Sequence, residues 1–463
     1  MKILLTHGYF LSEDEKEQLI MRPYVPLGIL YISAFLEKNG YDNDVFDSTF
    51  QTFNALTSKI LKDKPDVIGI YTNLMTKVNV LRIINIIKSE PSLANTIIVL
   101  GGPEVRNHAQ NFLMYGADII ILGEGEITML EVVQAVEEGK GWDGIQSLYF
   151  KDANGTIVKT EERKLNKELD ELPFPNRNKI DLNKYINTWE QRHGYSSINV
   201  STMRGCPYTC RWCSRAVYGQ SYRRRKPQLV VEEVKSLQQQ YKFKKIWFVD
   251  DVFTVSHKWL QEFVDELERQ NVVVSYECIS RADRLNEEVV QLLKRSGCFR
   301  VWIGAESGSQ KIIDAMDRRI DVLDTREKIQ LVKSYGVEAG TFIMLGYPGE
   351  TEEDIHETVH YLKTSQPDQF TITITYPIKG TPLYAEVEKD FLTNFPWENS
   401  TDRDIDFKRE YPRQYYEHAV KWVVNEVNAA KYISRMEIKK ALVSKLHAIK
   451  YKWQMGRAKK IPA

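Results

Sequence analysis

Short apolar runs alternate with amphipathic stretches along the first 150 residues of the chain. This alternation is typical of a parallel β-sheet with helices on its faces, so an α/β fold is predicted. Glycines and acidic residues directly follow several of the apolar runs, and this is where open sheets of this kind bind ligands. The segments that define the pattern are KILLT, LGILYISAFLEKNG, DNDVFD, PDVIGIYT, TIIVLGG and ADIIILGEGE.

Residues 151–195 are polar and do not continue the alternation. Asn154 and Gly155 form a turn signal, and Pro173 and Pro175 disfavour regular structure further along. We therefore expect a β-hairpin that leads into a linker.

A second alternating series occupies residues 196–385. Six apolar strands separated by amphipathic stretches predict a partial (β/α)6 barrel of the TIM type, short of the usual eight units, with its chemistry at the carboxyl ends of the strands. The alternation then stops, and residues 386–463 are predicted to be a largely helical tail. The six strands are INVSTM, KIWFVDD, VVVSYECIS, FRVWIGAES, GTFIMLGYP and FTITITYPI.

Composition adds limits on size, charge and compartment. A chain of 463 residues with 43% apolar residues can bury more than one core. Basic and acidic residues balance at 63 each, so no overall field attracts nucleic acid or an anionic membrane. The N-terminus MKILLTHGYF is unlike a signal peptide, and no apolar run approaches the roughly 20 residues that span a bilayer. We expect a cytoplasmic protein that is soluble or at most peripheral.

Three of the five cysteines lie within the stretch RGCPYTCRWC, at Cys206, Cys210 and Cys213. A zinc site needs a fourth ligand, and the nearest histidine, His193, precedes the strand that leads into this loop. A cubane iron–sulfur cluster fits better, because three cysteines leave one iron open to another ligand. Cys278 and Cys298 stand apart, and no spacing suggests a disulfide framework.

A CxxxCxxC loop after the first strand of a six-unit βα series, with an aromatic residue before its last cysteine, resembles the radical S-adenosylmethionine superfamily. The resemblance implies a 4Fe-4S cluster on the three cysteines, whose open iron chelates S-adenosylmethionine (SAM). Reductive cleavage of SAM would then give a 5'-deoxyadenosyl radical. A flavodoxin or ferredoxin is implied as the electron donor.

The same resemblance assigns cofactor-binding residues to other strand ends of the barrel. The acids of FVDD would stand where relatives hold the methionine amino group, although the usual glycines are absent. An arginine in ISRADRL could pair with the methionine carboxylate in a bidentate geometry. For each acid or arginine, a helix cap or a surface ion pair is the alternative. The residues assigned to SAM are Trp212, Asp250, Asp251, Arg281, Glu306, Ser307 and Gly346.

The segments PLGILYISAFLEKNGY, LGGPEV and ILGEGE resemble the cobalamin-binding domain of one radical SAM subgroup. Glycines at such positions let the backbone approach a bulky ligand, although glycine pairs after strands are often only turns. The DxHxxG signature is absent, and His7 is expected to be satisfied or solvated. We therefore expect cobalamin without a histidine on cobalt. The residues assigned to cobalamin are Leu27, Gly28, Gly101, Gly102, Gly123, Glu124 and Gly125.

The end of the chain is basic and amphipathic. Residues 431–463 carry ten basic residues and one acid, with large apolar residues at near-helical spacing. One interpretation is a helix in contact with anionic lipid. We favour the other, in which the apolar face packs on the barrel. The run YRRRKPQ after the cysteine loop could neutralise phosphates, but we expect it to line the cofactor or substrate mouth.

Together these features predict four segments: a Rossmann-like cobalamin domain (1–150), a linker (151–195), a radical SAM partial barrel (196–385) and a helical tail (386–463). The expected function is cobalamin-dependent C-methylation of an unactivated carbon in a small molecule, with lipid-like molecules and tetrapyrroles as candidate substrates. A cyclisation or oxidative rearrangement, as in the anaerobic magnesium-protoporphyrin ester cyclase group, is the alternative reaction. A non-catalytic iron–sulfur or zinc protein that binds nucleic acid is the alternative from another class.

Overall fold

A computed structural model describes residues 1–393 and 395–459. The chain divides into two compact units. The first unit comprises Met1–Pro207, Ser214–Lys245 and Phe395–Thr401. The second comprises Tyr208–Cys213 and the described residues of 246–394 and 402–463. These units interleave along the chain, so the four predicted segment boundaries stay a prediction.

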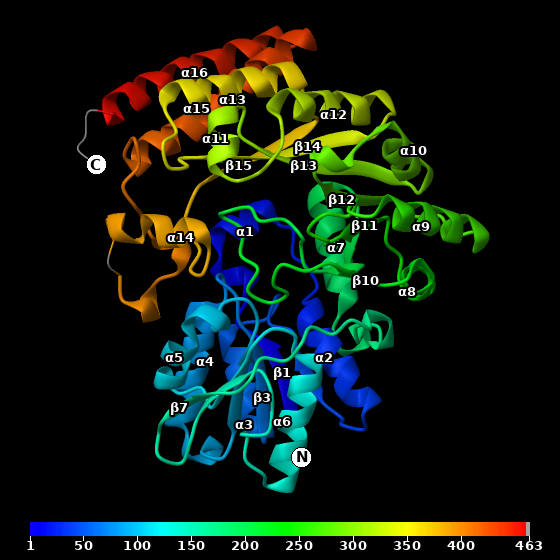
Figure 1. Cartoon of the computed structure of the whole chain (residues 1–463), viewed down its shortest axis with the longest axis vertical. Helices are drawn as coiled ribbons and strands as arrows, with labels where there is room; N and C mark the ends of the chain where they lie inside the picture. The colour runs from blue at the N-terminus through cyan, green and yellow to red at the C-terminus, as the bar shows by residue number, and fades with distance from the viewer. Residues whose placement is uncertain (394, 460–463) are drawn as a thin grey trace. The chain divides into compact units, whose positions relative to one another are not determined.

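The first unit contains a seven-stranded sheet in the order β2-β1-β3-β4-β5-β6-β7 (Figure 1). Its first five strands are parallel and the last two antiparallel. Parallel strands covered on both faces are apolar along their whole length, which explains the continuous runs in the sequence. The strands are β1 (Ile3–His7), β2 (Asp44–Phe46), β3 (Val67–Tyr71), β4 (Ile97–Gly101), β5 (Ile119–Ile121), β6 (Leu148–Lys151) and β7 (Ile157–Lys159).

Helices connect these parallel strands, and the core lies between the helices and the sheet. Ile70 and Leu100 of the sheet are buried with Val80, Ile84 and Phe112 of two helices in one apolar cluster. This confirms the predicted α/β architecture of the first 150 residues. The helices are α1 (Glu15–Ile20), α2 (Leu27–Lys38), α3 (Phe53–Asp63), α4 (Lys77–Ser89), α5 (Val105–Tyr115) and α6 (Glu126–Glu138).

Strands β6 and β7 form the hairpin predicted from the Asn154-Gly155 turn. The Gly155 amide donates to the carbonyl oxygen of Asp152 at 2.9 Å, and Gly155 has a φ of +79° that favours glycine. The hairpin extends the sheet instead of standing apart from it. The expected linker also contains an unforeseen helix, α7 (Leu182–His193), whose buried residues Leu182, Tyr185 and Trp189 follow helical spacing.

The predicted series of six strands is present. Strand β8 (Ser197–Val200) and helix α8 (Pro227–Gln240) belong to the first unit, and β10 (Arg223–Arg224) pairs there with β9 (Met203–Arg204). In the second unit, five parallel strands follow the order β15-β14-β13-β12-β11. These are β11 (Lys245–Phe248), β12 (Tyr276–Ser280), β13 (Cys298–Glu306), β14 (Glu338–Leu345) and β15 (Gln369–Ile374).

Side-chain caps fix where the helices of the second unit begin. Ser256, Asn286 and Asp321 each accept a hydrogen bond from the backbone N–H three residues later. Thr351 and Asp354 form a reciprocal capping box. The helices are α9 (His257–Arg269), α10 (Glu287–Arg295), α11 (Gln310–Ala315), α12 (Val322–Ser334) and α13 (Glu352–Ser365).

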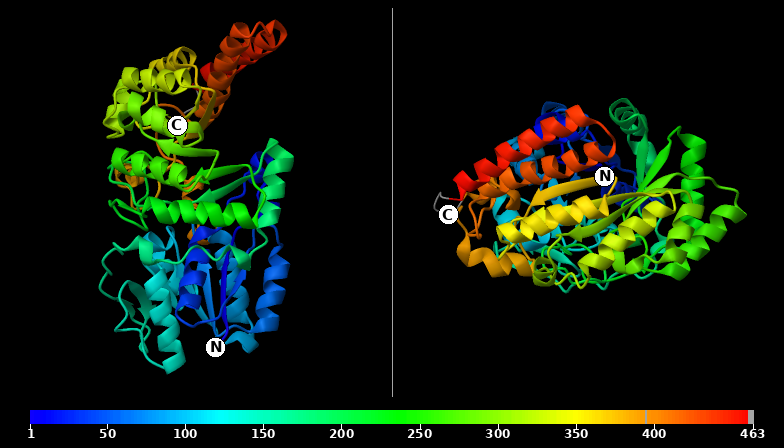
Figure 2. Two further views of the ribbon diagram at one scale, coloured as in Figure 1. Left: turned by 90° about the vertical axis from the view of Figure 1, so that its right-hand side faces the viewer. Right: turned by 90° about the horizontal axis from the view of Figure 1, so that it is seen from above.

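The tail is helical, as predicted, with α14 (Pro382–Val387), α15 (Arg413–Ser434) and α16 (Ile438–Ala458). Helices α15 and α16 lie side by side as an antiparallel hairpin (Figures 1 and 2). The expectation that the large apolar residues of α16 pack on the barrel is wrong. Apart from Met455, the residues buried on α16 are small: Ala441, Ser444, Ala448 and Ala458. The large apolar side chains of Ile438, Leu442, Leu446, Ile449 and Trp453 are exposed. None of the helices in the described part of the chain could cross a membrane, given their length and apolarity.

Candidate functional site

The cysteine loop begins directly after β9. Gly205 has a φ of +86°, and a Cβ atom there would lie 2.2 Å from Ser221 Oγ, so this position requires glycine. Cys210 is buried, Cys206 is half-buried and Cys213 is exposed, and none forms a disulfide. Among residues 1–393 and 395–459, no three His, Cys, Asp or Glu side chains are grouped closely enough to hold a metal ion. The donor set is therefore identified by its chemistry and spacing.

Two buried arginines face the thiol of Cys210. Arg318 Nη1 lies 3.3 Å from Cys210 Sγ, and Arg281 Nη1 lies 3.9 Å from the same atom. Guanidinium groups at this distance can donate hydrogen bonds to a sulfur that is bound to iron. The loop thus presents at least one cysteine in an environment suited to a metal-bound sulfur.

Arg281 and Arg318 differ in the hydrogen bonds they have left to offer. Arg281 Nε pairs with Asp283 Oδ1 at 2.8 Å, and its Nη2 donates to the Arg318 carbonyl oxygen at 2.9 Å. Its guanidinium also lies 3.8 Å above the Tyr208 ring. The bidentate pairing expected of Arg281 would therefore require it to give up existing partners. Arg318 Nε, in contrast, is buried and has no hydrogen-bond partner among the residues that the structure describes.

Glu306 ends β13 in a left-handed conformation, with a φ of +66°. This conformation is uncommon for a residue other than glycine and is concentrated at functional positions. Burial raises the pKa of the Glu306 carboxyl, although Arg318, 3.6 Å away, opposes the shift. The next residue, Ser307, is buried with its Oγ 3.3 Å from Thr358 Oγ1.

The two acids after β11 have different surroundings. Asp250 is buried, whereas the Asp251 side chain reaches the surface. Desolvation by nearby protein atoms and the neighbouring charge of Asp250 raise the pKa of Asp251. This environment suits a carboxylate that receives a cationic group.

Trp212 and Gly346 lie in one apolar region of the second unit. Trp212 packs on a cluster that includes Tyr347 and Leu383, and the Arg318 guanidinium lies 5.7 Å from its ring centre. Gly346 has a φ of +78°, and its amide donates to Glu350 Oε2 at 2.5 Å. Burial is the main reason that the pKa of Glu350 rises to about 8.

The glycines assigned to cobalamin have distinct surroundings in the first unit. A Cβ atom at Gly101, the last residue of β4, would meet nothing within 4 Å, so the backbone is open to a ligand there. A Cβ atom at Gly102 would instead lie 2.4 Å from the Thr72 carbonyl oxygen, so close backbone packing alone explains why glycine is required there. Leu27 and Gly28 begin α2, and the nearest atoms to a Cβ at Gly28 would be those of the Tyr71 ring, at 3.8 Å.

Gly123 and Glu124 line a cavity of about 290 Å³ in the first unit. Gly123 has a φ of +76°, and Gly125 precedes α6, where a Cβ atom would lie 3.0 Å from Ile32 Cδ1. The wall of the cavity carries charges of both signs. Its basic residues are Arg106, Arg163, Lys164 and Arg215, and its acidic residues are Glu124, Glu126 and Glu162.

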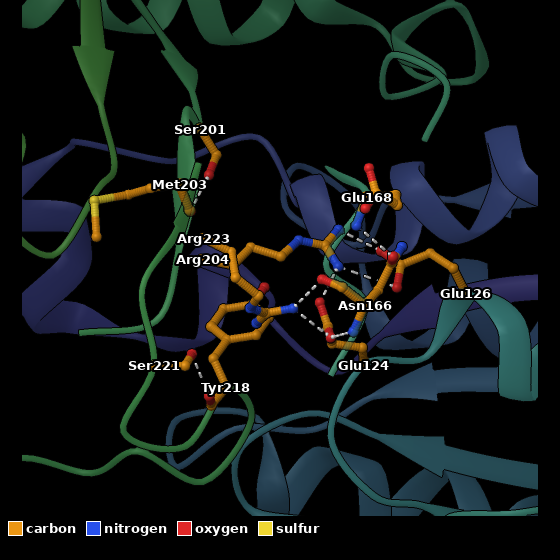
Figure 3. A network of polar contacts seen from close by, with 10 residues as sticks. All are labelled: Glu124, Glu126, Asn166, Glu168, Ser201, Met203, Arg204, Tyr218, Ser221 and Arg223. Atoms are coloured by element: carbon orange, nitrogen blue, oxygen red, sulfur yellow. Dashed lines mark hydrogen bonds and ion pairs between the residues drawn. The ribbon is translucent and has the colours of Figure 1, made fainter. Parts of the chain in front are cut away.

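Glu124 is part of a buried charge network (Figure 3). Arg204 Nη1 donates to Glu124 Oε1 at 2.7 Å, and the Arg204 guanidinium also pairs with both carboxylate oxygens of Glu126. Arg223 Nη1 donates to Glu124 Oε2 at 2.7 Å and to the Asn166 carbonyl oxygen at 2.7 Å. Burial would raise the pKa of Glu126, but Arg204 keeps it below its ordinary value.

This network joins β9, the strand before the cysteine loop, to the residues that follow β5. It also includes part of the run YRRRKPQ, whose predicted place at the cofactor or substrate mouth stays a prediction. Arg223 is held by Glu124, and the buried Arg225 is held by Glu233. The run is therefore built into the first unit, which also disfavours phosphate binding by it.

His7 is satisfied, as expected. Its Nε2 lies 3.0 Å from Asp47 Oδ1, and its Nδ1 accepts from the Tyr9 amide at 3.2 Å. Although burial opposes the shift, hydrogen bonds from His7 and Tyr185 hold the pKa of Asp47 below its ordinary value. Both ring nitrogens of His7 are thus used within the protein.

Sequence reasoning missed Arg318, Arg204 and Glu350 as residues of interest. Arg318 lies 108 positions from Cys210, in DAMDRRI, where it follows a residue with positive φ. No spacing in the sequence connects it to the cysteines. Arg204 could have been noticed because it immediately precedes the loop.

The residues present fit the groups that the sequence implies. Three thiols close together along the chain, one of them facing two guanidinium groups, fit an iron–sulfur cluster. Arg318 Nε, which has no partner among the described residues, and the carboxylates that follow β11 and end β13 offer complementary charge to the amino acid part of SAM. Gly101 leaves open space at a strand end for a bulky ligand.

Comparison with known proteins gives the same assignment. The model of the Radical SAM superfamily matches residues 200–362, and that of the B12 binding domain matches residues 22–133. The chain is 28% identical to an uncharacterized methyltransferase of Pyrococcus horikoshii, over 87% of each chain. It is 25% identical to the anaerobic magnesium-protoporphyrin IX monomethyl ester cyclase of Rubrivivax gelatinosus, over 84% of this chain and 70% of that protein.

Among solved structures, the fold is similar to that of OxsB, a cobalamin-dependent S-adenosylmethionine radical enzyme with aqua-cobalamin and S-adenosylmethionine bound. The TM-score is 0.76 at 16% identity, over 98% of this chain and 71% of that chain. The cysteine loop, the six-strand series and the two matching domains agree with one another. The chain therefore combines a radical S-adenosylmethionine domain with a B12 binding domain.

Proposed function

We propose that this enzyme uses a 4Fe-4S cluster, SAM and cobalamin to methylate an unactivated carbon of a small molecule. The observation that carries the proposal is the presence of a B12 binding domain and a radical SAM domain in one chain. When bound, these groups supply one-electron chemistry, hydrogen abstraction and a carrier for the methyl group. The protein then has to bind, orient and shield them.

The proposed cluster ligands are Cys206, Cys210 and Cys213. Arg318 and Arg281 support this role at Cys210, because their guanidinium groups stabilise negative charge on its sulfur. Hydrogen bonds to cluster sulfurs also raise the reduction potential of a cluster. The proposal therefore adds Arg318 to the set of residues expected from the sequence.

The proposed SAM site lies at the strand ends of the second unit. Asp250 and Asp251 would receive the amino group, and Glu306 and Ser307 the ribose or methionine part. Arg318 Nε, which has no partner, is better placed for the methionine carboxylate than Arg281, whose nitrogens are used. Trp212 and Gly346 would contact the remaining part of SAM.

The proposed cobalamin site uses Leu27, Gly28, Gly101, Gly102 and Gly123 to Gly125. The open backbone at Gly101 supports close approach of a large ring, and no histidine is proposed as a ligand of cobalt because His7 is bonded to Asp47. Glu124 would act indirectly, since Arg204, Arg223 and the Asn166 amide already occupy both of its oxygens.

Methyl transfer is favoured over cyclisation by the extent of similarity. The methyltransferase-named relative is matched over 87% of its length, and the cyclase relative over 70%. The cyclase reaction remains the second candidate, because the alignment with the cyclase relative covers 84% of this chain. A flavodoxin or ferredoxin is proposed as the electron donor, in the reducing conditions of the cytoplasm. A peripheral membrane contact is proposed for the exposed α16.

The test is an anaerobic assay of reconstituted protein with SAM deuterated in its methyl group, a reductant and a small-molecule extract from cells that lack the gene. We expect 5'-deoxyadenosine and a product that has gained a deuterated methyl group. A product that has lost hydrogens or gained oxygen, with no deuterated methyl group, would favour cyclisation or oxidation. Protein with the three loop cysteines replaced by alanine is the control.

A further inference from the structure

Helix α16 carries a stripe of large apolar side chains on its surface. Five residues at intervals of four, four, three and four positions fall on one side of an α-helix. Each is between 56% and 66% exposed. We call these residues the apolar stripe: Ile438, Leu442, Leu446, Ile449 and Trp453.

The orientation of α16 is fixed by the opposite side of the helix. Ala441, Ser444 and Ala448 are buried there and allow close packing with α15. Lys445 Nζ pairs with Glu426 of α15 at 2.6 Å, and Lys452 Nζ pairs with Glu352 of α13 at 2.6 Å. Rotation of α16 to bury the apolar stripe would break these ion pairs. It would also turn the small residues that now pack on α15 toward solvent.

Basic residues flank the apolar stripe. Lys439, Lys450 and Arg457 recur at helical spacing beside it, and Arg457 lies over the Trp453 ring at 4.8 Å. Within the described part of the chain, none of these three has an acidic partner within ion-pair distance, unlike the lysines that face α13 and α15. Glu437 is the single acid in residues 431–463. The exposed side of α16 is thus both apolar and cationic.

A contiguous exposed apolar patch marks an interaction surface. Helices with Lys and Arg beside exposed Leu, Ile and Trp bind in the interface plane of anionic membranes. A second copy of the chain is a less suitable partner, because a two-fold contact would bring the same unpaired lysines together. Figures 1 and 2 show α16 side by side with α15.

We propose that the apolar stripe inserts into the interface of an anionic lipid surface, with Lys439, Lys450 and Arg457 at the lipid phosphates. The helix lies parallel to the surface and does not cross it. The inference goes beyond the proposed reaction and does not depend on it, since lipid binding requires none of the cofactors.

The test is co-sedimentation of the full-length protein with vesicles of phosphatidylcholine alone or mixed with phosphatidylglycerol. We expect binding to the anionic vesicles that weakens at high salt. The variant Leu446→Glu/Ile449→Glu should bind more than about 100-fold more weakly, because two apolar side chains are replaced by charged ones. Leu323→Glu, a similarly exposed leucine of α12, is the matched control and should bind like the wild type.

A second pair of variants tests the charge contribution. Lys439→Gln/Lys450→Gln should weaken binding roughly 30-fold, as expected for two basic residues near an anionic surface. Lys235→Gln/Lys258→Gln, on exposed positions of α8 and α9, is the control and should change it by less than about threefold. Equal pelleting of the wild type and the stripe variant would overturn the proposal. The proposal would also be overturned if the wild type formed a dimer in analytical ultracentrifugation, the stripe variant were monomeric, and the wild type did not bind vesicles.

Discussion

Replacement of Arg204 by methionine would remove the cation between two buried carboxylates. Arg204 pairs with Glu124 and Glu126, and the side chains of all three are at most 10% exposed. In the variant, Arg223 still pairs with Glu124, but Glu126 has no other cationic partner at ion-pair distance among the described residues. A buried carboxylate without a partner is costly, so the folded state of the first unit is destabilised.

The expected loss is about 3–5 kcal/mol in the free energy of unfolding at neutral pH, which is the usual cost of breaking a buried ion pair from one side. The exposed pair of Arg295 and Glu268 provides a matched comparison, since these side chains are 49% and 57% exposed. Arg295→Met should cost no more than about 1 kcal/mol. The contrast separates burial from the simple removal of an arginine.

The loss should also depend on pH. In the wild type the pKa of Glu126 is lowered, so its contribution is present above the unfolded value and is lost as pH falls through the folded value. In Arg204→Met, burial without the cation raises the folded pKa, and the folded state becomes less stable as pH rises. The difference between the two proteins should therefore be larger at pH 7 than near pH 5.

Urea unfolding followed by circular dichroism at several pH values measures these differences. The double variant Arg204→Met/Glu126→Gln should recover a large part of the lost stability, because no charge is then left buried. A cost below about 1 kcal/mol that does not vary with pH would refute the reasoning. So would a double variant that is less stable than Arg204→Met.

Three further predictions concern other buried groups. As pH rises from about 4.5 to 8, the free energy of unfolding of Glu350→Gln should gain roughly 2–5 kcal/mol relative to that of the wild type. The reason is that only the wild type has a carboxyl at this position, and its pKa is raised to about 8 in the folded state. Equal urea midpoints for the two proteins across that pH range would contradict this. Arg318→Met should make the reduction potential of the cluster more negative, because a hydrogen bond to Cys210 Sγ is lost. Arg319→Met, at the neighbouring exposed position, is the control and should leave the potential unchanged. A redox titration monitored by electron paramagnetic resonance measures both potentials. Gly101→Leu should leave the thermal stability of the cofactor-free protein unchanged, because the new side chain would enter open space. It should weaken cobalamin binding, measured by absorbance titration, at least tenfold. Unchanged binding would remove Gly101 from the proposed site.

Much of the fold follows from the sequence because burial on both faces leaves a clear signature. Strands such as β3 and β4 are continuous apolar runs, so their existence and order were predictable. Helix α7 was missed because polar residues, mostly asparagine and threonine, separate its apolar positions within a segment that is polar as a whole. For α16, periodicity revealed an apolar stripe but could not reveal that Ala441 and Ala448, on the other side, make the packing contact.

The site divides in the same way. The cysteines were recognisable because their spacing is local. Arg318 was not, because only the folded chain brings it to Cys210 from the loop between α11 and α12. The basic run after the loop suggested a binding surface, but its arginines are paired within the protein. Arg223 pairs with Glu124, 99 positions away in the sequence, and Arg225 pairs with Glu233 on α8.

The most direct test of the account is electron paramagnetic resonance of the anaerobically reconstituted, reduced protein before and after addition of SAM. The account predicts about four irons per chain and a cluster signal that changes when SAM is added, because SAM occupies the iron left open by the three cysteines. Replacement of Cys206, Cys210 and Cys213 by alanine should abolish the signal, whereas Cys278→Ala, at a buried position outside the loop, should retain it. A protein that holds no such cluster, or one whose signal does not respond to SAM, would contradict the account.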